Sequence, residues 1–276
     1  MKALLRVTNW ERVSLWRRIP CAFARVSLLM IAIFALTLAL GPQLSVYFTT
    51  RTLAARDPAL NVAPRPLTDT SISRNPGTAV SYLGYTFEVP WQDNIKKEDV
   101  LDHFAAVRFD KGKAMMLIVP EDQSGLLNEV VDDEKLKVTY LRPLFAEFLK
   151  KPDYDQYFAL LNTTPQNIRA FGPRADAARG QALLMLKAMA FPANLESGVF
   201  SFDFPNMRGF QIGDPQKSQR IDLEIFGADG VHAEMTLLTD SKRGAPLSQP
   251  EINRTLASFR SVHLAMLDAV RPRLPQ

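Results

Sequence analysis

The residues best suited to chemistry lie on two neighbouring segments, residues 219–227 (QRIDLEIFG) and 231–239 (VHAEMTLLT). Both alternate polar and apolar residues, the period of two that is typical of half-buried β-strands. A two-residue loop between them would set charged side chains on the apolar face, whereas a three-residue loop at 228–230 keeps that face apolar. The sequence therefore predicts a hairpin whose other face carries acidic and histidine side chains: Asp222, Glu224, His232 and Glu234.

The predicted register places Glu224 directly opposite Glu234, with their Cβ atoms about 4.5–5.5 Å apart. Two like charges at that distance are unfavourable unless something compensates them. A bound cation would do so, and so would a raised carboxyl pKa that suits a general acid or base. The sequence favours a third interpretation, a solvated sheet face with Arg220 or Lys242 nearby, because one histidine with two glutamates matches no metal motif such as H-E-x-x-H.

Other catalytic signatures are absent from the sequence. It contains no G-x-S-x-G, P-loop or G-x-G-x-x-G motif, and Cys21 is its only cysteine, which excludes an intrachain disulfide and a cysteine-based zinc site. We expect no bound cofactor and favour a binding role over catalysis. RGFQIGDP combines an arginine, an aromatic ring and a tight turn, which makes Arg208, Phe210 and Asp214 candidates for an exposed recognition loop. An ordinary strand end is the favoured interpretation of this segment.

The charge of the chain is distributed unevenly. Its net charge is +4 over 276 residues, but residues 1–25 alone hold six basic groups and one acidic group. The rest of the chain has 27 basic and 28 acidic groups. Nucleic-acid binding requires a basic footprint, so this near-neutral remainder argues against it.

Residues 26–48 are free of charge and long enough to cross a bilayer core as a helix, which needs about 20 apolar residues. Basic residues are more numerous before this segment than after it, so the positive-inside rule puts 1–25 in the cytoplasm. We predict a single-pass protein of the cell (inner) membrane, with its C-terminal domain periplasmic or extracellular. The alternative is a cleavable signal peptide with its apolar core at 28–40, which would make the protein secreted and soluble.

Residues 49–79 contain four prolines among many Thr, Ser and Asp residues and show neither a helical nor a strand period. They predict a Pro-rich linker or stalk. Residues 80–276 form the predicted extracytoplasmic domain.

Strand and helix patterns follow each other along this domain. Alternation predicts strands at 85–91 and 199–239, and a hairpin turn at 110–112. Apolar periodicity predicts helices at 141–149, around 157–161 and at 175–191. Ser248 and Glu251 form a capping box that opens a last helix, expected to run to Pro272. The predicted fold class is α+β, an antiparallel sheet packed by helices.

Two short segments at the ends of this domain resemble PsbP-like extracytoplasmic domains. They are LGYTFEVPW (83–91) as an opening strand and INRTLASFR (252–260) as a closing helix. The resemblance bears on fold only, and it implies an accessory binding role of the kind associated with that fold.

These observations predict a membrane-anchored protein whose outer domain binds another envelope protein or a lipid-borne ligand. The alternative is a membrane-tethered hydrolase or metal-dependent enzyme that uses the polar face of the 219–239 hairpin. That alternative requires the four polar side chains to converge in a concave pocket.

Overall fold

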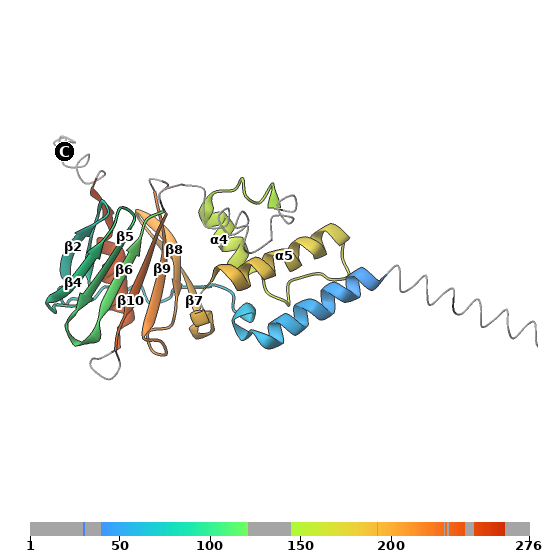
Figure 1. The fold of residues 1–276 in the computed structure, drawn as a ribbon, viewed down its shortest axis with the longest axis horizontal. Helices are drawn as coiled ribbons and strands as arrows, with labels where there is room; N and C mark the ends of the chain where they lie inside the picture. The colour runs from blue at the N-terminus through green and yellow to red at the C-terminus, as the bar shows by residue number, and fades with distance from the viewer. Residues whose placement is uncertain are drawn as a thin grey trace, which may run out of the picture.

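The computed structural model describes residue 30 and residues 40–120, 145–191, 193–228, 230, 232–240 and 246–262. These residues form an α+β domain in which a large sheet is packed by helices on one face and by a small sheet and one helix on the other (Figure 1). The predicted fold class is confirmed at this level.

The large sheet has eight strands within the described residues, and neighbours pair antiparallel except β1 with β7. The hairpin predicted around 110–112 joins two of them, β5 and β6. In spatial order the strands are β1 (Arg65–Pro66), β7 (Val199–Phe204), β8 (Met207–Ile212), β9 (Arg220–Gly227), β10 (His232–Leu238), β6 (Ala114–Ile118), β5 (Phe104–Phe109) and β4 (Ile95–Val100).

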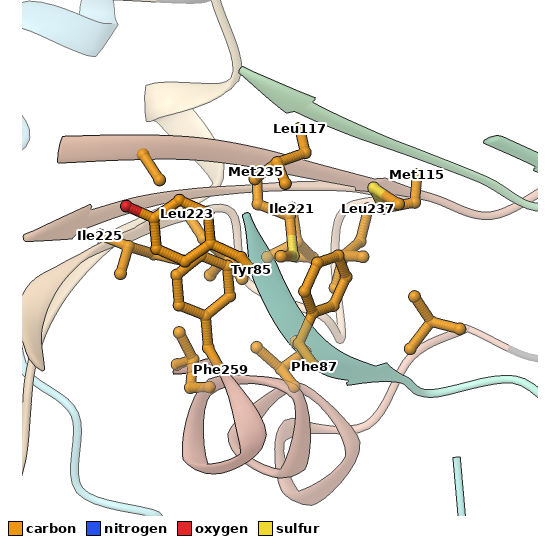
Figure 2. Packing of buried hydrophobic residues seen from close by; sticks show 14 of the residues in the cluster. Tyr85, Phe87, Met115, Leu117, Ile221, Leu223, Ile225, Met235, Leu237 and Phe259 are labelled. Carbon is orange, nitrogen blue, oxygen red and sulfur yellow. The ribbon is translucent and has the colours of Figure 1, made fainter. Parts of the chain in front are cut away.

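A three-stranded sheet covers one face of the large sheet. It consists of β11 (Arg260–Ser261), β3 (Tyr85–Val89) and β2 (Thr78–Tyr82), and it is accompanied by helix α6 (Gln249–Ser258). Figure 2 shows Tyr85, Phe87 and Phe259 from this layer against the apolar side chains of β6, β9 and β10. Burial of these rings and aliphatic chains supplies the main core of the domain.

Helices cover the opposite face of the large sheet over β7, β8 and β9. They are α4 (Asp153–Asn162) and α5 (Arg174–Ala190), and the 3-10 helix η4 (Ala193–Ser197) follows α5 and leads into β7 (Figure 1). A second apolar cluster fills the space between them and the sheet, including Tyr157, Leu160, Phe210 and Phe226. The helix predicted at 175–191 is therefore confirmed. The start of the helix predicted at 141–149 lies outside the described residues.

The last helix differs from its prediction. Its capping box at Ser248 and Glu251 is present, but α6 ends at Ser258. The next residues form β11, which pairs with Tyr85 and Thr86 of β3. The Ser258 hydroxyl accepts the Glu88 N–H at 2.8 Å. The chain therefore pairs with the edge of the small sheet at the point where the apolar stripe predicted that the helix would continue. The predicted remainder of that helix, after residue 262, lies outside the described residues.

Residues 49–79, predicted as a Pro-rich linker or stalk, pack along the domain. Residues 40–56 are helical, and η1 (Pro58–Asn61) follows with Leu60 fully buried. β1 then adds to the edge of the large sheet. Further along, the Asn253 side chain donates to the carbonyl groups of Asp69 and Ser71 at 2.7 and 2.8 Å. The prolines of this segment therefore do not prevent tertiary contact.

Lys187 of α5 fastens this segment to the helices. Its side chain is fully buried, and its Nζ donates to the carbonyl oxygens of Val62, Leu161 and Thr163 at 2.6, 2.8 and 3.0 Å. Burial lowers the pKa of this ammonium group to about 8. One side chain therefore joins the middle of the 49–79 segment and the end of α4 to α5.

The predicted membrane segment, residues 26–48, is described only at residue 30 and from residue 40 onward. Among the residues that the structure describes, no helix has both the length and the apolar character needed to cross a bilayer.

Candidate functional site: a buried carboxylate–histidine cluster

The predicted hairpin register is confirmed in β9 and β10. Ile225 pairs with Ala233, Leu223 with Met235, and Glu224 with Glu234. The apolar face of the hairpin is buried in the main core. Gly230 has the positive φ of +81° expected of the loop, although two other residues of the turn, 229 and 231, lie outside the described residues.

The polar face of the hairpin is buried, so the prediction of a solvated face is wrong. Asp222, Glu224 and His232 are only 6%, 7% and 7% exposed. Phe226 stacks on the His232 ring with centroids 4.6 Å apart, and Tyr157 of α4 meets that ring edge-on at 5.1 Å. We call Asp222, Glu224, His232 and Glu234 the carboxylate–histidine cluster.

Glu224 and His232 form the centre of this cluster, with 2.9 Å between Oε2 and Nε2. Burial, followed by the charge of Asp222, raises the pKa of Glu224 to about 8. Burial lowers the pKa of His232, although the charges of Glu234 and Asp153 oppose this. Both shifts favour the uncharged forms of the two groups, which share the hydrogen bond between Oε2 and Nε2.

This arrangement leaves the other ring nitrogen of His232 unsatisfied. Nδ1 is buried and has no hydrogen-bond partner among the residues that the structure describes. A buried polar group without a partner costs about 1–3 kcal/mol. The cluster is therefore incomplete as a purely structural network.

Asp222 is held separately at the edge of the cluster. Arg220 Nε donates to both of its carboxylate oxygens at 2.9 Å, and the Thr236 hydroxyl donates to Oδ1 at 2.6 Å. The arginine expected near the polar face is present, but this contact is with Asp222 and not with Glu224. Lys242, the other expected cation, lies outside the described residues.

Glu234 completes a group of possible metal ligands. One carboxylate oxygen from each glutamate and a ring nitrogen of His232 all lie within 4.8 Å of one another. Glu224 and His232 are buried, whereas Glu234 is partly exposed. The structure therefore brings together three of the four residues that the sequence selected on this hairpin as one potential donor set.

The sequence did not identify the residues of α4 that close over the cluster. Asp153 is close enough that the charge on His232 lowers its pKa, although burial has the larger effect and raises it. Tyr157 belongs to the second apolar cluster and contacts the His232 ring. The helical pattern placed both residues on a helix, but nothing in it indicated where that helix would pack.

The predicted recognition loop does not form. Phe210 is fully buried and stacks on Tyr154 with centroids 5.2 Å apart. The Arg208 guanidinium lies 3.9 Å from the centre of the same Tyr154 ring, and the Asp214 carboxylate accepts the Gln216 N–H at 2.9 Å within a turn. Because β8 lies between β7 and β9, its aromatic residue belongs to the core beneath α4. The favoured interpretation, an ordinary strand end, is confirmed, since β8 ends at Ile212 just before the turn.

An open groove of about 710 Å³ lies elsewhere, where α6 meets β2 and β3. Small side chains make up much of its lining: Ala79, Ser81, Thr86, Ala257 and Ser258. Ile72, which is exposed, and Arg260 also line it, and Arg254 is fixed there by an ion pair with Glu88 at 2.5 Å. A second, smaller hollow is lined by residues of α4, α5 and the turn between them. Neither contains a residue of the carboxylate–histidine cluster.

Comparison with known proteins finds no matching family, no matching curated protein and no matching solved structure. The resemblance of residues 83–91 and 252–260 to PsbP-like domains therefore stays a prediction.

Proposed function

We propose that this chain is a single-pass protein of the cell membrane whose extracytoplasmic domain rests on the bilayer and binds another component of the envelope. A patch of exposed aromatic and basic side chains beside the predicted span carries this proposal. The buried position of the carboxylate–histidine cluster supports a binding role over hydrolysis, because Glu224 and His232 are buried and Tyr157 and Phe226 cover the His232 ring.

Two segments far apart in the sequence form this patch. Tyr47 of helix 40–56 contacts Phe171 of the turn before α5, with ring centroids 5.9 Å apart, and Phe48 and Phe171 are exposed. Figure 1 shows helix 40–56 running alongside α5. Arg51, whose guanidinium lies 5.6 Å from the Tyr47 ring centre, and Arg169 add positive charge. We call these five residues the membrane-facing patch.

The composition of the patch suits a membrane interface. Tyrosine and other aromatic rings gather at the level of the lipid headgroups. Basic side chains near an anionic surface contribute about 1 kcal/mol each. Because Lys187 fixes residue 62 to α4 and α5, a span ending near residue 48 would hold the domain in one orientation against the bilayer.

We expect two results from the full-length chain in native membranes. Washing the membranes with alkaline carbonate should leave the chain in the membrane fraction, and release of the chain would contradict the predicted membrane anchor.

The second experiment uses a Cys21→Ser background. An environment-sensitive dye on Phe171→Cys should report an apolar surrounding and be quenched by lipid-attached quenchers. The matched control is Leu101→Cys at the β4–β5 turn, since Leu101 is 65% exposed and Phe171 57%. Equal signals from both positions would contradict the contact while leaving the anchor intact.

The groove between α6 and β2 is the proposed partner site, because its volume lies within the 300–1,000 Å³ usual for binding pockets. A photo-cross-linking residue at Ile72 should capture one reproducible envelope component, and the same residue at Leu101 should not. Ala79→Arg, which fills the groove floor, should reduce the cross-linked yield at least tenfold. Capture that survives this substitution would show that the groove is not the binding site.

A further inference from the structure

We propose that Glu224, Glu234 and the His232 imidazole form a binding site for one divalent transition-metal ion, such as Zn²⁺ or Mn²⁺. This inference is independent of the membrane anchor and of the groove. The confirmed pairing of Glu224 with Glu234 sets two carboxylates side by side on neighbouring strands. His232 lies two residues before Glu234 and projects to the same face.

The distances suit one ion after small adjustments. Bonds from zinc to nitrogen or oxygen are about 2.0–2.2 Å, so two ligand atoms on one ion lie at most about 4.4 Å apart. The three ligand atoms here lie within 4.8 Å of one another, and the closest pair, Glu224 Oε2 and His232 Nε2, is 2.9 Å apart. A side-chain rotation at Glu234, which is partly exposed, would complete the set.

The charge around the cluster also favours a cation. Asp222 and Glu224 lie on one strand and Glu234 on the next, and the register places all three carboxylates on the same face. A divalent ion between Glu224 and Glu234 would offset the repulsion of these opposed carboxylates.

His232 provides a second, independent observation. Its side chain is more than nine-tenths buried, its Nε2 points at Glu224, and its Nδ1 has no partner among the residues that the structure describes. Histidines that ligate metals usually donate their other ring N–H to a carboxylate or a carbonyl group. Asp153, at the first turn of α4, is the nearby carboxylate that could accept it.

The donor set indicates the class of ion. Imidazole nitrogen with carboxylate oxygen suits Zn²⁺, Mn²⁺ and related ions, whereas Mg²⁺ and Ca²⁺ prefer oxygen alone. Access is available from the side of Glu234, which is partly exposed. Tyr157 and Phe226 cover His232 and would keep water from that side of the ion.

The test uses the full-length chain purified in detergent, stripped with a chelator and dialysed against Zn²⁺, Mn²⁺, Co²⁺, Mg²⁺ or Ca²⁺. We expect one Zn²⁺ or Mn²⁺ per chain, a rise in Tm on binding, and visible absorption from bound Co²⁺. Glu234→Gln should raise the Kd at least 100-fold. This variant is preferred because Glu234 is partly exposed and the substitution preserves side-chain volume, and Glu224→Gln should act in the same direction. Asp153→Asn, which alters a supporting residue, should raise the Kd about tenfold.

Matched controls are Glu196→Gln and His103→Ala, which change exposed residues outside the cluster and should leave the Kd unaltered. The absence of stoichiometric binding of any transition ion to the wild-type chain would overturn the proposal. So would binding that Glu234→Gln and Glu224→Gln leave unchanged while both variants remain folded by circular dichroism. Those outcomes would assign Glu224 and His232 to a proton-sharing structural pair.

Discussion

Replacement of Lys187 by methionine is expected to lower the free energy of unfolding by about 3 kcal/mol, the largest effect that we predict. Methionine keeps an apolar stem of similar length, so the core volume is preserved. It leaves the carbonyl groups of Val62, Leu161 and Thr163 without their donor. A buried polar group that loses its partner costs about 1–3 kcal/mol, and part of this is recovered because no ammonium ion is buried any longer.

Two measurements check this result. Denaturant unfolding of the detergent-purified chain gives the stability. Limited trypsin digestion after Arg56 reports whether the segment that begins at residue 57 detaches, whereas Pro66 protects the Arg65 bond from trypsin. We expect faster cleavage after Arg56 in Lys187→Met. Lys150→Met is the control, because the Lys150–Glu147 pair is exposed and should contribute under 1 kcal/mol. A Lys187→Met chain as stable and as protease-resistant as wild type would show that the three carbonyl contacts are dispensable.

The substitution Gly209→Ala is expected to destabilise the domain by about 2–3 kcal/mol. A Cβ at this buried position of β8 would lie 1.9 Å from the Glu224 carbonyl oxygen and 2.6 Å from the Phe202 ring. The backbone of β9 and a core aromatic ring would both have to move, and such overpacking costs about 1–3 kcal/mol or more. The displacement acts directly on Glu224, so metal affinity should fall as well.

Gly41→Ala provides a comparison at a glycine with open space around it, where no atom lies within 4 Å of the added Cβ. It lies in helix 40–56, so alanine should be neutral or slightly stabilising there. Denaturant unfolding of both variants separates the effect of crowding from that of losing a glycine. If Gly209→Ala unfolds within 0.5 kcal/mol of wild type by this measurement, β8 and β9 do not approach as closely as the structure places them.

The sequence alone determined the features that depend on neighbouring residues. The register of β9 and β10 follows from alternation on both sides of a glycine-containing turn, because a shift by one residue would set charged side chains on the apolar face. The start of α6 follows from Ser248 and Glu251, whose contacts lie within a single helical turn. The pairing of Glu224 with Glu234 was predicted for the same local reason, and this pairing identified the candidate site.

Only the tertiary structure decided which surfaces are buried. A period of two shows that one face of a strand is polar, but not whether a helix from elsewhere covers it. Here Tyr157 of α4 covers His232, so the face that the sequence predicted to be solvated is buried. Phe210 became core for the same reason. The packing of residues 49–79 depends on Lys187 and Asn253, both distant along the chain. Contacts of this kind leave no periodic signal in either partner, because each segment only has to complement a surface that the other helps to build.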